Sequence, residues 1–345
     1  MGLTKQNQEI LYIDGFAGPG KYKNYEEGSP IAALKAAQSA IETSGLRWKA
    51  GNVHCAFIEA DEKRFMHLQQ EIKGWDQVKG LKTYPLEMSF HEGLAVLREQ
   101  LPKPFEKSHP LFVFIDPFGA TGAPFTSVAE ILNSPCSEVL INLDADGIAR
   151  IFLAEGKANS EETLNSIFGD SSWKMLPGKG THFPTLCRAV LDLYKTRLRS
   201  LPNIRFVFAF EMQTTVGALN YFLVFASQHP LGLEKMKEAM KTIDQDGNYR
   251  FSDGSLNQPS LFRFNDPAIY SPRLFDRFKG QTVSYDVLKE FALNETVFVN
   301  PKSMLKDLEL RDRIKVFSQD ANRRKGTFSQ TDNLRIQFEN GDANG

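Results

Sequence analysis

The stretch Leu11-Tyr12-Ile13-Asp14-Gly15-Phe16-Ala17-Gly18-Pro19-Gly20 runs from an apolar segment into a carboxylate and then into a turn of small residues. Glycine permits a positive φ and has no Cβ, so a ligand can lie directly against the main chain of such a turn. Open α/β sheets bind ligands at the carboxyl ends of their strands, which is where Asp14 would lie. A purely structural turn remains an open alternative for this segment taken alone.

The composition is that of an ordinary globular protein. The chain has 345 residues, of which 41% are hydrophobic and 24% charged, which suits one long or two shorter domains. The net charge of −1 does not indicate a polyanionic partner, so a nucleic-acid surface would have to be a local patch. No apolar stretch suggests a membrane span or a signal peptide, and we expect a cytoplasmic protein without membrane attachment.

The cysteines give no sign of a metal site. Cys55, Cys136 and Cys187 are far apart, and none has a cysteine or histidine partner at metal-ligand spacing. We therefore predict no bound metal.

Short, nearly continuous apolar runs recur along the first two-thirds of the chain, with helical or mixed segments between them. This pattern is typical of buried parallel strands joined by crossover helices. The predicted strands are residues 11–14, 53–59, 111–116, 139–144 and 204–210, with a weaker one at 81–86.

The last two apolar runs differ from the others in their connection. Residues 204–210 and 221–226 are separated by a short polar stretch, which is too short for a crossover helix, so these two strands should be antiparallel. A mostly parallel sheet that ends with one antiparallel strand is the layout of class I methyltransferases. The sequence therefore predicts an α/β, Rossmann-like sheet of this class.

We divide the chain as follows. Residues 1–250 form the α/β domain, with a polar insertion at about 148–180 on its substrate side. Residues 251–280 read as a linker. Residues 281–338 have the order helix, helix, strand, basic turn, strand, which predicts a small α+β module like a winged helix. We expect the tail 339–345 to be disordered.

Further acidic residues follow the predicted strands. Glu59 ends the second strand, where a carboxylate suits the two hydroxyls of a ribose, and Asp61 follows two residues later. Alternatively, Asp61 caps the next helix and Glu59 faces solvent. Glu87 follows the weaker strand, where an adenine amine would need an acceptor, and a solvent-facing loop is the alternative.

The fourth group is Asp116-Pro117-Phe118-Gly119, directly after an apolar strand. The Asp116 carboxylate and the Pro117 carbonyl can accept hydrogen bonds from an amine, and Phe118 can stack on a flat substrate. Acceptors of this kind orient the nitrogen lone pair, and methyl transfer then needs mainly positioning. The alternative is a simple turn with Phe118 packed in the core.

These motifs together resemble one known family. The segments 12–20, 57–59, 114–119 and 221–226, with 229–237 and 323–328, are similar to the three-Cys-motif partner protein (TcmP) family over roughly residues 11–328. The resemblance implies a class I, S-adenosylmethionine-dependent methyltransferase domain of undefined substrate. It also implies a neighbouring radical-SAM protein, which carries the three cysteines of the family name.

A more distant similarity concerns the methyl acceptor. Residues 16–18 and 116–118 are similar to segments of amino-directed DNA and RNA methyltransferases. Those enzymes usually have a second proline third and an aromatic residue fourth, whereas here Phe118 is third and Gly119 fourth. A family of guanine-dimethylating tRNA methyltransferases also has Asp-Pro-Phe-Gly, which keeps an RNA substrate open.

The sequence thus predicts a methyltransferase that acts on an amine of a nucleobase or nucleic acid. Asp116, Pro117 and Phe118 are the predicted catalytic residues. A non-catalytic partner subunit that recruits a radical-SAM protein or a nucleic acid is the alternative. The basic turn Arg323-Arg324-Lys325 is a candidate contact for DNA or RNA. The residues expected to hold S-adenosylmethionine are Asp14, Phe16, Gly18, Gly20, Glu59, Asp61 and Glu87.

Overall fold

The computed structural model describes residues 9–22, 27–45, 51–107, 109–154, 159–178, 180–213, 219–243, 250–252, 266–328 and 334–340. The chain divides into two compact units, which are described separately. Met1–Met212 and Leu219–Gln228 form the first unit, and Gln213–Ala218 and His229–Gly345 form the second. The first unit contains every predicted cofactor and catalytic residue.

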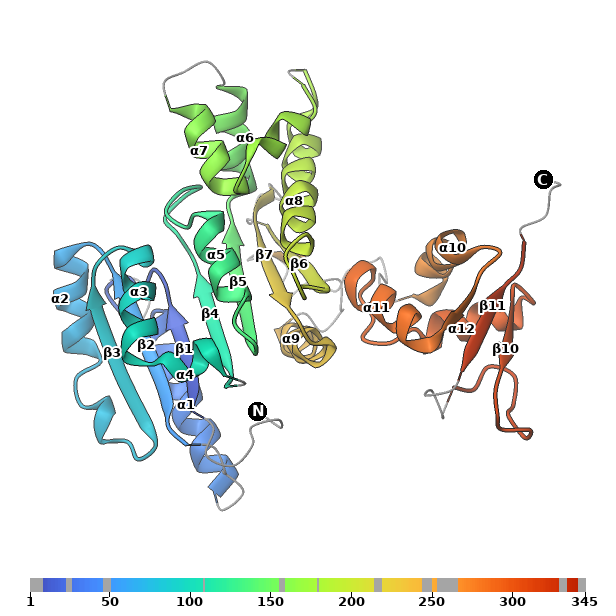
Figure 1. The fold of residues 1–345 in the computed structure, drawn as a ribbon, viewed down its shortest axis with the longest axis horizontal. Helices are drawn as coiled ribbons and strands as arrows, with labels where there is room; N and C mark the ends of the chain where they lie inside the picture. Colours follow the sequence, from blue (N-terminus) through green and yellow to red (C-terminus); the bar gives the residue numbers. More distant parts are fainter. Residues whose placement is uncertain are drawn as a thin grey trace. The chain divides into compact units, whose positions relative to one another are not determined.

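Seven strands of the main sheet form the centre of the first unit, in the order β3-β2-β1-β4-β5-β7-β6 (Figure 1). Strands β1 to β5 pair in parallel, and β7 pairs antiparallel with β5. This order and direction are those of a Rossmann-like class I methyltransferase sheet, and they confirm the predicted fold class. The strands are β1 (Ile10–Asp14), β2 (Val53–Glu59), β3 (Leu81–Glu87), β4 (Leu111–Ile115), β5 (Ser137–Leu143), β6 (Phe206–Gln213) and β7 (Leu219–Ser227).

The alternation of side chains along the strands creates two apolar layers, one on each face of the sheet. In β2, Phe57 packs on one face with Leu34 of α1 (Ser29–Ser44) and Leu68 of α2 (Glu62–Glu71). The neighbouring Ile58 packs on the opposite face. That face is covered by α3 (Phe90–Gln100), α5 (Phe125–Leu132) and α8 (Phe183–Arg199). The short elements η2 (Trp75–Gln77) and α4 (Pro102–Glu106) complete the connections around β3.

The predicted insertion at 148–180 is partly built into the core. It contains most of α6 (Ala145–Leu153), together with α7 (Ser160–Phe168) and η3 (Ser171–Met175). Figure 1 shows α6 and α7 side by side. Phe168 and Trp173 are buried in the same apolar cluster as the strands, so this segment extends the core although its sequence is polar overall.

The second unit has its own apolar core around a three-stranded antiparallel sheet in the order β10-β11-β9. Its strands are short, and three helices pack around the same core. The described elements of this unit are α9 (Pro230–Ile243), β8 (Arg250–Ser252), α10 (Pro267–Phe278), β9 (Thr282–Ser284), α11 (Tyr285–Glu295), α12 (Lys302–Leu310), β10 (Ile314–Phe317) and β11 (Arg335–Phe338).

Two predicted boundaries differ from the structure. Helix α10 occupies much of the stretch 251–280 that read as a linker, and its Leu274 and Phe278 are buried. This helix was not predicted from the sequence, because Pro272 lies inside it and proline usually ends a helix. Helix α9, placed by the sequence in the α/β domain, belongs to the second unit. Most of the predicted tail, residues 341–345, lies outside the described residues.

None of the helices in the described ranges combines the length and the apolar character that a membrane crossing requires.

Candidate functional site

The glycine turn after β1 is held in place by backbone hydrogen bonds to both neighbouring strands. The amide of Gly15 donates to the carbonyl of Phe114 in β4 at 2.9 Å, and the amide of Ala17 donates to Ile58 in β2 at 2.9 Å. Gly18 and Gly20 have φ angles of 63° and 79°, which residues with a Cβ rarely adopt. The turn is therefore a preset main-chain cradle at the carboxyl edge of the sheet.

Asp14 ends β1 and is completely buried. Its Oδ1 accepts the amide of Phe16 at 3.3 Å, whereas its Oδ2 has no hydrogen-bond partner among the described residues. Burial raises the pKa of Asp14 to about 7, and this rise is partly offset by Ser29 and the Phe16 amide. The negative charges of Asp116 and Glu59 raise the pKa of Asp14 further, because they disfavour its ionised form.

Glu59 faces the glycine turn rather than solvent, and its side chain is only 6% exposed. Its Oε2 accepts the amide of Gly18 at 2.9 Å, and its Oε1 accepts the amide of Asp61 at 2.8 Å. Arg64 lies 3.1 Å from the same Oε1. Glu59 therefore lies at the edge of the sheet, and its Oε2, which has a single donor, retains a lone pair for a further donor.

Asp61 has the structural role given as the alternative in the sequence analysis. It is the N-cap of α2, and its Oδ1 accepts the amide of Arg64 at 2.9 Å. Its side chain is exposed. The geometry therefore assigns Asp61 to the helix, and Glu59 to the turn.

Glu87 lies at the end of β3 opposite Glu59 in the β2–β3 register, and it is exposed. The next residues belong to the fold: Met88 packs against the core, and Ser89 forms a capping box with Glu92 at the start of α3. Phe16 is partly buried, with its ring 5.4 Å from that of Phe90. Glu87 and Phe16, which are both predicted to contact the cofactor, thus lie at the carboxyl edge of the sheet.

Tyr22 lies at the site, although it is not among the residues predicted to hold the cofactor. The loop that carries it is closed by a 2.7 Å hydrogen bond from the Gly28 amide to the Gly20 carbonyl. A Cβ placed on Gly18 would come within 2.5 Å of the Tyr22 hydroxyl, so the tyrosine lies directly over the turn. Partial burial raises the pKa of Tyr22, and the charges of Asp116 and Asp14 raise it further.

Asp116 follows β4, next to β1 in the sheet. Burial raises the pKa of its carboxyl, and a hydrogen bond from Asn142 partly offsets this rise. The Asn142 Nδ2 donates to Asp116 Oδ1 at 2.5 Å. Phe118 is 98% exposed, which rules out the alternative that this ring is packed in the core. An almost fully exposed aromatic ring beside a half-buried carboxylate is an unusual surface feature, and it suits stacking on a flat ligand.

A hollow of about 500 Å³ opens beside Asp116. Its volume is within the range of small-molecule sites. It is formed by the ends of β4, β5 and β7 together with the start of α6. The lining residues are Pro117, Gly119, Asn142, Asp144, Asp146, Gly147, Arg150 and Tyr221.

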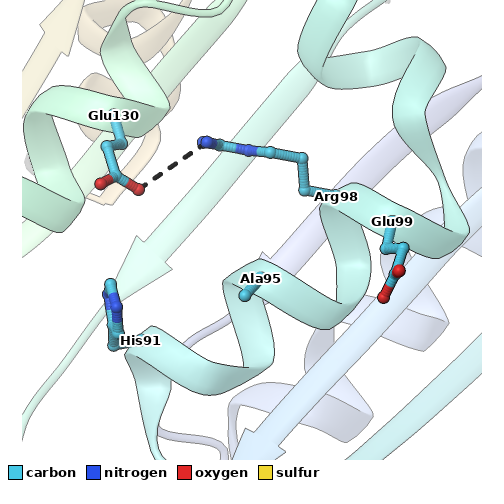
Figure 2. A pocket seen from close by; sticks show the side chains of 5 residues that line it. All are labelled: His91, Ala95, Arg98, Glu99 and Glu130. Carbon is cyan, nitrogen blue, oxygen red and sulfur yellow. Dashed lines mark ion pairs between the residues drawn. The ribbon is translucent and has the colours of Figure 1, made fainter.

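A second hollow, of about 280 Å³, lies on the outer sides of α3 and α5 (Figure 2). Its charged residues are Arg98, Glu99 and Glu130, and Arg98 lies 3.8 Å from Glu130. His91 contacts the hydroxyl of Ser127 at 3.2 Å. It shares no lining residue with the first hollow and, unlike that hollow, includes no residue next to Asp116. We therefore assign it no part in the site.

The basic turn 323–325 is less available than its sequence indicates. Arg323 forms a bidentate pair with Glu309, at 2.7 and 2.6 Å, and the two side chains are only 14% and 8% exposed. Lys325 pairs with Asp312 at 2.5 Å, on the surface. The guanidinium of Arg323 therefore holds the turn, which makes Arg323 a weaker candidate for a nucleic-acid contact than its sequence indicates. Arg324 is exposed and stays a candidate.

No cluster of three or more potential metal ligands occurs in the part of the chain that the structure describes. Cys55 and Cys187 are buried, and Cys136 is exposed.

Comparison with known proteins gives only distant similarities. The sequence matches no family model and no curated protein. An O-methyltransferase from Bacillus cereus in complex with SAH is 13% identical, with 64% of this chain and 74% of that chain covered and a TM-score of 0.33. An rRNA methylase from Streptococcus thermophilus is 12% identical, with 64% and 89% covered and a TM-score of 0.28. These values are too low to assign a family.

Proposed function

We propose that this chain is an S-adenosylmethionine-dependent methyltransferase that acts on an amine of a nucleobase. The observation that carries the proposal is that β2, β1 and β4 lie side by side and parallel, so Asp14, Glu59 and Asp116, which end or follow these strands, come to one edge of the sheet. Such an edge suits a ligand that carries positive charge and hydroxyl donors.

The residues at this edge fit the cofactor. Asp14 has an oxygen without a partner and suits the ammonium group, and Glu59 suits the ribose hydroxyls. The open main chain at Gly18 and Gly20 allows close approach. S-adenosylmethionine supplies an electrophilic methyl group when bound. The location of Phe16 and Glu87 at the same edge supports their predicted contacts with the cofactor.

Asp116, Pro117 and Phe118 would hold the methyl acceptor beside it. The Asp116 carboxylate and the Pro117 carbonyl accept the two N–H groups of an amine, which keeps the nitrogen lone pair free for the new N–C bond. As this bond forms, the nitrogen becomes positively charged and loses a proton, which Asp116 takes. The exposed ring of Phe118 would stack on the base.

Two measurements test the proposal. Calorimetry should show binding of S-adenosylhomocysteine, and tritium from labelled S-adenosylmethionine should pass to nucleosides. Asp116→Ala should leave the affinity for S-adenosylhomocysteine unchanged within about twofold and lower transfer by roughly 10²–10⁴-fold. Asp192→Ala, an exposed carboxylate on α8, is the matched control. Comparable turnover in Asp116→Ala would remove the proposed mechanism.

The second candidate is a non-catalytic partner subunit of the TcmP type that recruits a radical-SAM protein. The nearly complete exposure of Phe118, next to Gly119 with a φ of 89°, favours it, because an exposed ring can also dock on a protein. A pure scaffold need not bind S-adenosylhomocysteine, so the calorimetry separates the two candidates.

We further infer that the second unit contains a winged-helix-like module. Its element order, α10-β9-α11-α12-β10-β11, and its antiparallel sheet support this inference. Helix α12 exposes Lys302 and Lys306, and Gly326 of the basic turn lies against Lys306. These lysines together with Arg324 are the candidate contacts for DNA or RNA.

A further inference from the structure

Asn142 connects two neighbouring strands at the candidate acceptor site. The pairing of Ile115 with Ile141 in the β4–β5 register brings residues 116 and 142 side by side just beyond it. The Asn142 Nδ2 donates to Asp116 Oδ1 at 2.5 Å, which fixes the carboxylate and supports its ionised form.

This hydrogen bond also fixes the orientation of the Asn142 amide. Its Oδ1 must point away from Asp116, because two oxygens in contact would repel each other. That Oδ1 is shielded from solvent and has no hydrogen-bond partner within the described residues. A buried acceptor without a partner is rare in proteins and calls for a ligand donor or another specific explanation. Asn142 is one of the residues that line the hollow beside Pro117, so its Oδ1 lies behind the wall of the hollow, and a donor in the hollow pairs with it when the wall moves slightly.

We propose that Asn142 is a specificity residue of the acceptor site, and that it selects an amine flanked by a second N–H donor, as on the Watson–Crick edge of guanine. The inference rests on the proposed function and names its substrate class. The site would then offer three hydrogen-bond acceptors to the N–H donors of a base: the Asp116 carboxylate, the Pro117 carbonyl and Asn142 Oδ1.

Hydrogen-bond complementarity separates the bases. Guanine presents its N1–H beside its N2 amine, so both donors meet acceptors. Adenine and cytosine present an unprotonated ring nitrogen beside the amine, and this nitrogen would face the Asn142 oxygen. The amide cannot turn to accommodate it, because its oxygen would then meet the Asp116 carboxylate.

The test compares ribosides as acceptors of tritium from labelled S-adenosylmethionine at pH 8. 2-Aminopurine riboside keeps the 2-amine but has an acceptor at N1, and a site built for a donor rejects such an analogue strongly. We expect kcat/KM for guanosine to exceed that for 2-aminopurine riboside, adenosine and cytidine by at least roughly 100-fold. Inosine, which has N1–H and no amine, should inhibit competitively without being methylated.

Two variants test the role of Asn142 itself. Asn142→Ala should bind S-adenosylhomocysteine like the wild type and lose most of the preference for guanosine, to below about 10-fold. Asn142→Asp should move the acid limb of the pH profile of kcat/KM to higher pH, because a donor to Asp116 is replaced by a like charge. Asn133→Ala, an exposed asparagine at the end of α5, should change neither property.

Several outcomes would overturn the inference. These are equal rates for guanosine and 2-aminopurine riboside, an unchanged preference in Asn142→Ala, an unmoved pH profile in Asn142→Asp, or no transfer to any riboside while S-adenosylhomocysteine binds. Absence of S-adenosylhomocysteine binding to the wild type would instead remove the proposed function. Unchanged cofactor binding by the Asn142 variants shows that they are folded.

Discussion

The side chain of Glu59 accepts the backbone amide of Gly18 at 2.9 Å, across 41 residues of sequence. The end of β2 is thereby tied to the turn after β1, and the acid that would hold a ribose also holds the main-chain cradle. A change at Glu59 should therefore affect cofactor binding and the stability of the turn together.

Glu59→Gln tests this coupling. The amide has one oxygen, whereas the carboxylate accepts the amides of both Gly18 and Asp61, so one buried N–H loses its acceptor. We expect the free energy of unfolding to fall by about 1–3 kcal/mol, measured by urea denaturation. We also expect at least a tenfold loss of affinity for S-adenosylhomocysteine by calorimetry. Glu62→Gln, which changes an exposed residue in the first turn of α2, should alter neither; wild-type binding by Glu59→Gln would contradict the role of Glu59.

The buried charge of Asp14 should make stability depend on pH. Its pKa in the folded protein is about 7, above the value of about 3.9 for an unfolded chain. The folded state therefore holds the proton more tightly, and the contribution of Asp14 to stability is complete below about pH 4 and is lost as the pH rises through 7. The full difference corresponds to about 4 kcal/mol.

Asp14→Asn removes this titration. We expect the variant to be more stable than the wild type at pH 8, with the difference in unfolding free energy growing between pH 5 and pH 8 in urea titrations. Taking the difference between the two proteins cancels the contributions of Asp116 and other groups that titrate in both. A difference that does not change with pH would show that Asp14 is already ionised in the folded protein at pH 5.

Cofactor binding should be coupled to the same proton. An ammonium group placed at Asp14 favours the ionised carboxylate, so binding of S-adenosylhomocysteine near pH 6.5 should release a proton. Calorimetry in phosphate and in Tris buffer measures this release from the difference in apparent enthalpy. Asp14→Asn should bind more weakly and release no proton through this group. Equal proton release by the two proteins would place the ammonium group elsewhere.

The strands were predictable because parallel strands buried on both faces require continuous apolar runs, and residues 53–59 and 111–115 have them. Asp14, Glu59 and Asp116 were predictable for a related reason: each directly follows such a run, and the carboxyl ends of parallel strands meet at one edge. Local sequence was sufficient for both.

The roles of the remaining residues could not be predicted from local sequence, because they depend on contacts between distant parts of the chain. Asn142 lies inside an apolar run, and its meeting with Asp116 follows from the register of β4 and β5. Tyr22 reaches the site through the loop closure between Gly28 and Gly20. Arg323 looked like a free basic residue because its partner Glu309 lies 14 residues earlier, on a helix that covers it.

Lys237 should be essential to the second unit. It is completely buried on α9, and its Nζ donates to the carbonyls of Thr296 at 2.7 Å, Phe298 at 3.2 Å and Ala292 at 3.4 Å. Lys237→Met would leave these carbonyls without that donor, and we expect a loss of about 1–3 kcal/mol in the free energy of unfolding. Lys241→Met, on the exposed side of α9, should have little effect. Equal stability of the two variants would show that water replaces the lysine.

The two arginines of the basic turn should respond in opposite ways to substitution. Arg323→Ala leaves the Glu309 carboxylate buried without its guanidinium partner, and breaking a buried pair of this kind typically costs about 3–5 kcal/mol. We expect this variant to lower the thermal unfolding midpoint clearly. Arg324→Ala removes an exposed side chain and should leave stability unchanged within about 0.5 kcal/mol.

Binding to a fluorescent DNA or RNA duplex then separates the two roles. At a temperature where both variants are folded, Arg324→Ala should weaken binding and reduce its dependence on salt, because one phosphate contact is lost. Lys315→Ala serves as the control for general charge, because Lys315 is a surface lysine on β10 that pairs with Glu339. Equal weakening by Arg324→Ala and Lys315→Ala would mean that the turn attracts nucleic acid only through net charge. An unstable Arg324→Ala with a stable Arg323→Ala would contradict the assignment of Arg323 to the fold.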